Sequence, residues 1–330
     1  MTLLDDLEGE LGRVARVTVL TRLATSRLNF PGPNDIRIFI PDIHLLSSEA
    51  RARFDFLGQH PSHALLKATL GRLAQFRTTV KTRDPNSVCA IYFMGDFLDF
   101  WREGAPGDDV GVTAARIAAE HQDLVDLACA PELKARFLMG NHDFELCRLP
   151  SFAAADRRYF FPPTDPTSVA VHGDVFDWIE DFPDQLNQSI LYYFSPFANV
   201  LDHFFSDIAN FIRNANPNHL GSDEVQPVPN QGAPAVICTT TEEAEQRHDL
   251  FKRAFEARNR VFDDFDIDLR TMIIGHTHGP RIVPYASGDD FFALVDTGGW
   301  LDDSKDAAAE RGMLTAFCGN DIRIYQLSPL

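Results

Sequence analysis

Five short clusters of Asp, Asn and His residues hold the side chains best suited to chemistry in this chain of 330 residues. Carboxylate and amide oxygens, combined with imidazole nitrogens and without thiolates, are ligands for hard to borderline divalent ions such as Mn²⁺, Fe or Zn²⁺. The clusters therefore predict a site for metal-assisted chemistry. In chain order they are Pro41-Asp42-Ile43-His44, Gly95-Asp96, Gly140-Asn141-His142-Asp143, His172-Gly173-Asp174 and Gly275-His276-Thr277-His278.

The spacing within the clusters favours convergence on one site. Asp42 and His44 are two residues apart, as are His276 and His278. Residues at this spacing on an extended chain point the same way. The clusters offer seven candidate ligands, too many for one tetrahedral ion. They fit two ions about 3.5–4 Å apart that share a bridging carboxylate, an arrangement that stabilises the attacking and leaving oxygens of phosphoryl transfer.

Each cluster begins where a candidate β-strand ends. In open α/β sheets, sites assemble at the carboxyl ends of strands, so clusters far apart in sequence can meet in one crevice. The strands that precede the clusters are predicted at 36–40, 88–94, 136–139, 169–171 and 272–274. Helical patterns at 64–78 and 113–127 alternate with the early strands, as expected of a mixed α/β domain. Closely spaced strands are predicted afterwards at 281–284, 291–296, 313–317 and 322–325.

The β pattern stops between 175 and 270, which predicts an α-helical insertion. Seven apolar residues there recur at steps of four and three, as on one face of a helix. A second helical stretch is predicted at 241–262. Two interpretations remain open: core packing of a helical subdomain, or an apolar lid or groove for a lipid-like substrate or a membrane face. The seven residues are Ile190, Phe194, Phe197, Leu201, Phe204, Ile208 and Phe211.

Composition limits the partners and the compartment. With 48 acidic and 30 basic residues, the chain has a formal charge of −18, which disfavours nucleic acid polymers as partners. Five cysteines without a C-x-x-C pair are typical of a reducing compartment. The acidic N-terminus is unlike a signal peptide and predicts an amphipathic helix. Since no apolar run reaches about 18 residues, we expect a cytoplasmic protein without a transmembrane span; its oligomeric state is not predicted.

The motifs D-x-H, G-D, G-N-H-D, H-G-D and G-H-T-H, in this order, resemble those of the calcineurin-like metallophosphoesterase superfamily. The resemblance covers roughly residues 36–175 and 270–300. It implies a four-layer αββα sandwich with a dimetal centre. We therefore expect a catalytic core formed by 31–174 and 271–330, an N-terminal helical extension at 1–30, and an α-helical insertion or cap at 175–270.

The resemblance also assigns roles to individual residues. Asp96 would bridge the two ions, and a metal-bridging hydroxide would be the nucleophile. His142 would stabilise the phosphoryl charge or protonate the leaving oxygen, and Asp99 would hold His142 in its tautomer. The first ion is assigned to Asp42, His44, Asp96 and His278. The second is assigned to Asp96, Asn141, His172 and His276. Of the possible ions we expect Mn²⁺, with Fe or Zn²⁺ as alternatives.

Other polar residues near the motifs have structural alternatives. Asp99, Asp143 and Asp174 could instead be turn residues that cap neighbouring backbone. Arg102 and Arg148 could hold a substrate phosphate or form ordinary ion pairs. The remaining histidines lack partners at ligand spacing and are expected at the surface or satisfied in the core; they are His60, His63, His121, His203, His219 and His248.

Departures from related groups narrow the activity. Ser/Thr protein phosphatases of the superfamily carry an Arg directly after the second Asp of G-D-x-x-D, where this chain has Phe100. The strings GDFLDFW, GNHDF and VDTGGW are more similar to UDP-2,3-diacylglucosamine hydrolases, whose insertion caps acyl chains. The N-terminal helix and the long segment between Asp42 and Asp96 depart from that group. We expect a dimetal phosphoesterase that cleaves a phosphate ester or pyrophosphate bond of a small-molecule or lipid-linked substrate, with peripheral membrane contact through the insertion open. The alternatives are a UDP-diacylglucosamine-type pyrophosphatase, a protein phosphatase or a non-catalytic scaffold.

Overall fold

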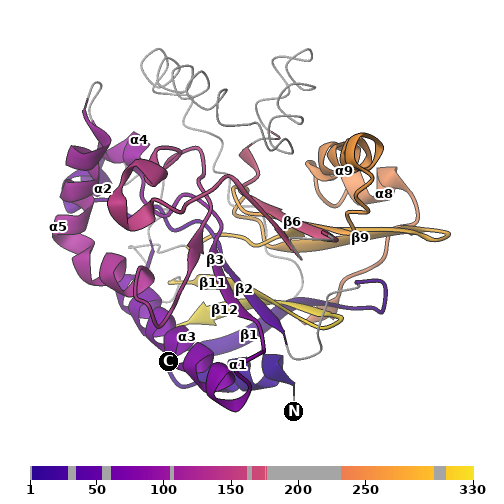
Figure 1. The fold of residues 1–330 in the computed structure, drawn as a ribbon, viewed down its shortest axis with the longest axis horizontal. Coiled ribbons are helices and arrows are strands. Elements are labelled where there is room, and N and C mark those ends of the chain that lie inside the picture. The colour runs from indigo at the N-terminus through magenta and orange to yellow at the C-terminus, as the bar shows by residue number, and fades with distance from the viewer. Residues whose placement is uncertain are drawn as a thin grey trace.

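The computed structural model describes residues 2–28, 35–53, 61–104, 108–161, 166–174, 176, 232–300 and 310–330. Two β-sheets pack face to face in this part of the chain (Figure 1). The strands of the first sheet are β1 (Arg16–Ala24), β2 (Ile36–Ile40), β3 (Cys89–Phe93), β4 (Arg136–Phe137), β7 (Ala233–Pro234), β11 (Gly312–Cys318) and β12 (Asp321–Ser328). Those of the second are β5 (Arg158–Phe161), β6 (Ser168–Val171), β8 (Thr271–Ile274), β9 (Arg281–Ser287) and β10 (Asp290–Asp296). Their orders are β4-β3-β2-β11-β12-β1-β7 and β5-β6-β8-β10-β9.

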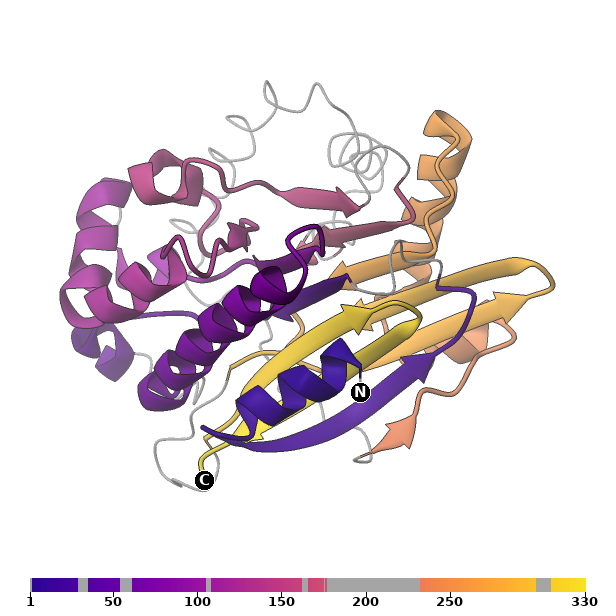
Figure 2. The ribbon, with the colours of Figure 1, turned by 60° about the horizontal axis from the view of Figure 1, so that its bottom comes forward.

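Helices cover the outer face of each sheet. Figure 2 shows α1 lying across the seven-stranded sheet, and α3 and α5 share a hydrophobic core with the same face. The other helical layer, α8 and α9, packs on the five-stranded sheet. The helices are α1 (Leu3–Leu11), α2 (Ser48–Arg53), α3 (His63–Arg83), α4 (Phe100–Glu103), α5 (Val110–Ala128), α8 (Thr241–Glu245) and α9 (Phe251–Phe265), with 3₁₀ turns η2 (Leu146–Arg148) and η3 (Pro150–Phe152).

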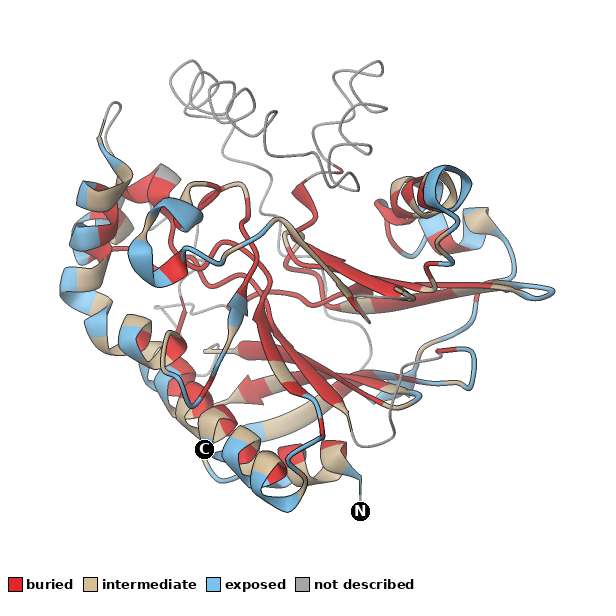
Figure 3. Cartoon of the chain, viewed as in Figure 1, coloured by how far each residue is buried: buried red, intermediate tan, exposed pale blue. Residues whose placement is uncertain are grey.

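Three hydrophobic clusters occupy the three interfaces between these four layers. In β2, Ile38 belongs to the cluster beneath α1, α3 and α5, whereas Phe39 belongs to the cluster between the sheets. In β8, Met272 faces α9 and Ile273 faces the other sheet. Alternate strand residues point to opposite faces, so these strands are buried on both sides (Figure 3). The predicted four-layer αββα sandwich is confirmed.

The N-terminal region differs from the prediction of one continuous helix. Helix α1 ends at Leu11, and residues 16–24 form β1, which pairs antiparallel with β12. The segment RVTVLTRLA is rich in β-branched residues, which fit a pleated, half-buried surface. Helix α1 itself is amphipathic, as expected, because its Leu4, Leu7 and Leu11 are all buried. Strand β5 was also absent from the sequence prediction.

Most of the predicted insertion lies outside the described residues, including the seven apolar residues between 190 and 211. Its described part contains α8 and α9, where one helical stretch was expected at 241–262. In α9, Phe251, Ala254, Ala257 and Val261 are buried against the five-stranded sheet. Here α9 forms the outer layer of the sandwich. The domain boundaries at 1–30, 31–174, 175–270 and 271–330 stay predictions.

Candidate metal centre

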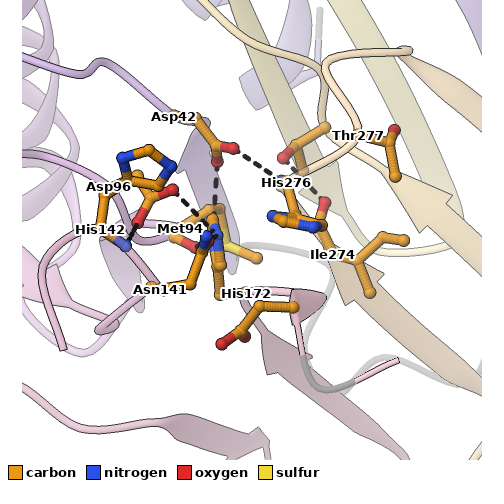
Figure 4. A network of polar contacts seen from close by, with 12 residues as sticks. Asp42, Met94, Asp96, Asn141, His142, His172, Ile274, His276 and Thr277 are labelled. Atoms are coloured by element: carbon orange, nitrogen blue, oxygen red, sulfur yellow. Dashed lines mark hydrogen bonds and ion pairs between the residues drawn. The ribbon is translucent and has the colours of Figure 1, made fainter. Parts of the chain in front are cut away.

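The five motif clusters lie in loops that follow β2, β3, β4, β6 and β8. Backbone hydrogen bonds tie these loops to one another. The amide of His44 donates to the carbonyl of Asp96 over 2.7 Å, and the amide of Gly275 donates to the carbonyl of His172 over 2.8 Å. Figure 4 shows side chains from each of the clusters gathered around one space. Residues separated by up to 234 positions, Asp42 and His276, therefore come into contact.

Four candidate ligands adopt the left-handed backbone conformation. The φ angles are 54° for His44, 49° for Asp96, 72° for His276 and 54° for His278. Only six non-glycine residues in the described part of the chain have a positive φ. This conformation is uncommon for residues with a Cβ and is concentrated at functional sites, where the surrounding structure enforces it. The loops therefore hold these four side chains in the orientation that the site needs, at a cost in local backbone strain.

Two glycines of the motifs are required by close packing against carboxylates. A Cβ at Gly140 would collide with the side-chain oxygen Oδ1 of Asp96. A Cβ at Gly275 would collide with Oδ1 of Asp42. Only a residue without a side chain lets the backbone approach so closely. The glycines therefore explain why each carboxylate can lie directly against a neighbouring loop.

Asp42, His44 and His278 form the first group of possible metal ligands, and all three are buried. Nε2 of His278 lies 3.3 Å from Nε2 of His44 and 3.3 Å from Oδ2 of Asp42. Burial lowers the pKa of His44, which favours the neutral ring that a ligand needs. Oδ1 of Asp42 and Nδ1 of His278 are buried without a hydrogen-bond partner among the described residues. The atoms that approach one another, Nε2 of His44, Nε2 of His278 and Oδ2 of Asp42, lie close enough together to share a bound cation.

Asp96, His172 and His276 form the second group. Nδ1 of His172 lies 2.9 Å from the carbonyl of Met94, so this nitrogen carries a proton. Its other nitrogen, Nε2, faces Oδ1 of Asn141 at 3.0 Å and Oδ2 of Asp96 at 3.2 Å. Burial lowers the pKa of His172, but the charges of Asp96 and Asp42 outweigh it and raise the pKa well above its usual value. This position therefore favours positive charge, as a metal ion would supply.

Asp96 lies between the two groups. Its Oδ2 atom is 3.8 Å from Nε2 of His44 and 3.2 Å from Nε2 of His172. Its other oxygen, Oδ1, accepts a hydrogen bond of 2.9 Å from the backbone amide of His142. The side chain is buried. One carboxylate oxygen is thus directed at both groups, which is the position that a bridging ligand needs.

Asp99 holds two histidines at once. Its Oδ1 lies 2.8 Å from Nδ1 of His142, and its Oδ2 lies 3.2 Å from Nδ1 of His44. Arg102, which is also buried, approaches Oδ2 at 3.3 Å. Burial raises the pKa of Asp99, but the charges of His142 and Arg102 outweigh it and hold the pKa well below its usual value. The ionised carboxylate therefore fixes both rings with Nδ1–H toward Asp99 and Nε2 toward the site.

His142 itself gains positive character from its surroundings. Burial lowers the pKa of His142, but the charges of Asp99 and Asp96 outweigh it, so that the pKa is raised. A raised pKa keeps more of the imidazolium form at neutral pH. The carboxylates around His142 therefore favour the imidazolium form, which can stabilise anionic oxygens.

The other acidic and basic residues near the motifs have structural partners. Asp143 accepts hydrogen bonds from the backbone amides of Gly140 at 2.7 Å and Phe97 at 2.9 Å, so it has the structural role of a turn residue. Burial and the charge of Asp96 raise the pKa of Asp143 to about 7. Asp174 is buried 3.7 Å from the guanidinium of Arg157. Arg102 lies against Asp99, and Arg148 pairs with Glu145 near the surface.

A further buried network anchors the turn that carries His276 and His278, and it was not predicted. Oδ2 of Asp296 accepts hydrogen bonds from the hydroxyl of Thr277 and from Nε2 of His248, the latter at 2.9 Å. The amide of Leu250 donates to Nδ1 of His248, which leaves the ring proton on Nε2. His248 is thus a satisfied core residue, as expected, but with a positioning role. Asp296 could have been found from the sequence, because it lies at the end of a predicted strand, as the motif residues do. His248 could not, because its spacing from other polar residues follows no pattern.

Comparison with known proteins places this site in context. Residues 38–280 match the sequence model of the calcineurin-like phosphoesterases. A conserved uncharacterised protein from Streptococcus pneumoniae TIGR4, described as a predicted phosphoesterase, is 13% identical over 86% of this chain and 83% of that chain, with a TM-score of 0.28. A metallophosphoesterase from Sphaerobacter thermophilus is 12% identical over 90% of this chain and 89% of that chain, also with a TM-score of 0.28. No curated protein matches significantly. The matched range includes all five clusters.

Proposed function

The chain belongs to the calcineurin-like phosphoesterase family, and we propose that it hydrolyses a phosphate ester or pyrophosphate bond with two divalent ions. Family membership makes it a metal-dependent phosphoester hydrolase. The two-ion centre, the role of each residue and the substrate are the parts that we propose. The arrangement of the chain's own side chains supports the two-ion centre and the residue roles, and family membership supports a phosphate substrate.

The observation that carries the proposal is the position of Asp96. Its Oδ2 atom lies within 3.8 Å of Nε2 of His44 and within 3.2 Å of Nε2 of His172, which belong to separate ligand groups. If only one ion were bound, the buried ligand atoms of the other group would lie close together with no cation between them. We therefore assign Asp42, His44, Asp96 and His278 to one ion, and Asp96, Asn141, His172 and His276 to the other.

Bound divalent ions would supply a more acidic water molecule and neutralise charge on the phosphoryl oxygens. The chain's own contribution centres on His142. Asp99 holds Nδ1 of this ring at 2.8 Å, and we assign the contact with a substrate to Nε2. The charges of Asp99 and Asp96 raise the pKa of His142 and so favour the protonated ring, which can stabilise the phosphoryl charge or donate a proton to the leaving oxygen.

The donor set supports Mn²⁺ as the resident ion, with Fe or Zn²⁺ as alternatives. Three oxygen-bearing residues and four imidazoles combine hard and borderline ligands, and the described ligand groups contain no thiolate. Metal analysis of protein purified without added metal would identify the ion. An ion bound outside this group of three would contradict the assignment.

We propose a small-molecule phosphate substrate. A lipid-linked substrate or a peripheral membrane contact would depend on the apolar residues between 190 and 211, which lie outside the described residues. Among the residues that the structure describes, no helix combines the length and apolarity needed to span a membrane. The cytoplasmic location stays a prediction.

The test is hydrolysis of p-nitrophenyl phosphate and of bis(p-nitrophenyl) phosphate by protein loaded with Mn²⁺. We expect turnover of at least one ester and saturation at two ions for each chain. Removal of metal with a chelator should abolish turnover, and added Mn²⁺ should restore it. Saturation at one ion would overturn the two-ion proposal, and a loaded protein inert on both esters and on nucleotide-sugar pyrophosphates would overturn the proposed substrates.

A further inference from the structure

A second pair of imidazoles lies outside the site described above, where α3 and α5 approach each other. His63 is the first residue of α3, and His121 lies within α5. His121 is also the point at which α5 departs from helical geometry, with φ of −123° and ψ of 22°. The Nδ1 atoms of the two rings are 3.2 Å apart. The kink in α5 thus coincides with the residue that brings the two rings together.

The partners of the other ring nitrogens fix where the protons lie. Nε2 of His121 is 2.7 Å from the carbonyl oxygen of Leu46, and a carbonyl can only accept. Nε2 of His63 is 3.1 Å from Oδ2 of Asp123. A hydrogen bond from Lys67 lowers the pKa of Asp123 to about 2, so this carboxylate also only accepts. Both imidazoles therefore carry a proton on Nε2.

With their protons on Nε2, neutral rings direct the Nδ1 lone pairs of His63 and His121 at each other across 3.2 Å. Such lone pairs repel unless a cation lies between them. Histidines that bind metal usually donate their other N–H to a carboxylate or a backbone carbonyl, as both rings do here. Two Zn–N bonds of about 2.1 Å at a tetrahedral angle would place the nitrogens about 3.4 Å apart, close to the observed separation.

We propose that His63 and His121 bind a borderline divalent ion of the Zn²⁺ type through their Nδ1 atoms, at a site separate from the two-ion centre. Two imidazoles suit Zn²⁺ better than Mn²⁺. The His63 side chain is 40% exposed, which gives an ion access from solvent. A hollow of about 20 Å³ adjoins both rings and is large enough for one water molecule as a further ligand.

The site has a connection to the two-ion centre. The hydrogen bond from His121 ends on Leu46, two residues after the candidate ligand His44. The hollow beside the pair is also lined by His44. An ion that orders the ring of His121 therefore also restrains the loop that carries Asp42 and His44. Zn²⁺ at this site would act as a structural support for the first ligand group.

The test is a count of bound Zn²⁺ in the full chain. In His63→Gln and His121→Gln, the amide group can still donate to Asp123 or Leu46, but the Nδ1 ligand is lost. After equilibrium dialysis at saturating Zn²⁺, we expect the wild type to hold one more ion per chain than either variant. Asp96→Asn serves as the matched control, because it should lose ions from the two-ion centre and keep the ion at the histidine pair.

The competing explanation is a proton shared by the two Nδ1 atoms. In wild-type protein with ¹⁵N-labelled histidine, Zn²⁺ should shift the Nδ1 resonances of His63 and His121 and leave their Nε2 atoms protonated. This measurement needs no variant to fold. Equal Zn²⁺ counts in the wild type and both variants, or a proton on Nδ1 that saturating Zn²⁺ does not displace, would overturn the proposal.

Discussion

The candidate centre has two halves: the loops after β2, β3 and β4 of the seven-stranded sheet, and the loops after β6 and β8 of the five-stranded sheet. The two halves orient their candidate ligands by different means. In the half from the seven-stranded sheet, one carboxylate, Asp99, contacts both the candidate ligand His44 and the candidate acid His142. In the half from the five-stranded sheet, His172 is oriented by a backbone carbonyl, and the turn between His276 and His278 is anchored through Thr277. If these residues have the roles that we propose, metal binding and proton transfer are coupled in the first half and separate in the second.

The largest effect is expected where the halves meet. Asp96→Asn replaces the oxygen directed at both groups with an amide that carries less charge and can coordinate through one oxygen only. We expect loss of bound Mn²⁺ and a fall in kcat/KM by about three orders of magnitude or more, since metal ions supply several kcal/mol to such reactions. Elemental analysis and ester hydrolysis measure the two effects. A variant that retained two ions and activity would exclude Asp96 as the bridge.

The next effect separates chemistry from metal binding. His142→Ala or His142→Asn removes the imidazole but none of the proposed ligands. We expect two bound ions, as in the wild type, with a loss of about 10²–10⁴-fold in kcat, the usual contribution of general acid catalysis. A substrate with a good leaving group, such as p-nitrophenol, should suffer less than an alkyl phosphate. A loss of metal equal to the loss of turnover would assign His142 to the ligands instead.

Asp99→Asn tests the coupling within the first half. Asp99 accepts from both His44 and His142, but an amide has only one accepting oxygen, so one ring loses its partner. We expect a drop of about 10–100-fold in Mn²⁺ affinity, as for other residues that orient a ligand, together with lower turnover. Asp109→Asn is the matched control, because Asp109 also caps a helix with its carboxylate, through the amide of Gly111 at the start of α5, and none of its described contacts reaches either histidine.

The pH profile gives the same substitution a second readout. The charge of Asp99 raises the pKa of His142, so Asp99 should hold the alkaline limb of the activity profile at a higher pH than it would have without that charge. Without that charge the pKa of His142 is lower, and the alkaline limb should move to lower pH. The kcat profile of Mn²⁺-saturated protein checks this. An unchanged alkaline limb would mean that His142 is not the titrating acid.

The candidate ligands could be predicted from the sequence, whereas the residues that orient them through distant contacts could not. The motifs are visible because each follows an apolar strand, and strand ends meet at one edge of a sheet. The contact between Asp99 and His44 spans 55 positions, and that between His248 and Asp296 spans 48. Neither leaves a periodic or spacing signal, because tertiary packing alone brings them together. The helix predicted at the N-terminus extended past Gly12 into residues 16–24, a β-branched segment that forms a strand. Its partner strand β12 lies at the other end of the chain, so this pairing also leaves no local signal.

The smallest effect is expected at the far end of the second half. His248→Ala removes the N–H that binds Asp296 and leaves a buried carboxylate with one donor fewer. Because Asp296 also anchors Thr277, the turn between His276 and His278 should loosen. We expect Mn²⁺ affinity to fall by about tenfold, whereas the alkaline limb of the pH profile stays in place, since the described contacts of His248, Asp296 and Thr277 do not include His142.

His248→Gln makes that prediction specific. Its side-chain amide can donate to Asp296 from nearly the position of Nε2, so it should recover most of the Mn²⁺ affinity lost in His248→Ala. Plain damage to the core would weaken both variants alike and lower their melting temperatures together. A shifted alkaline limb in either variant would show that the halves are coupled after all, and the separation of metal binding from proton transfer in the second half would then be wrong.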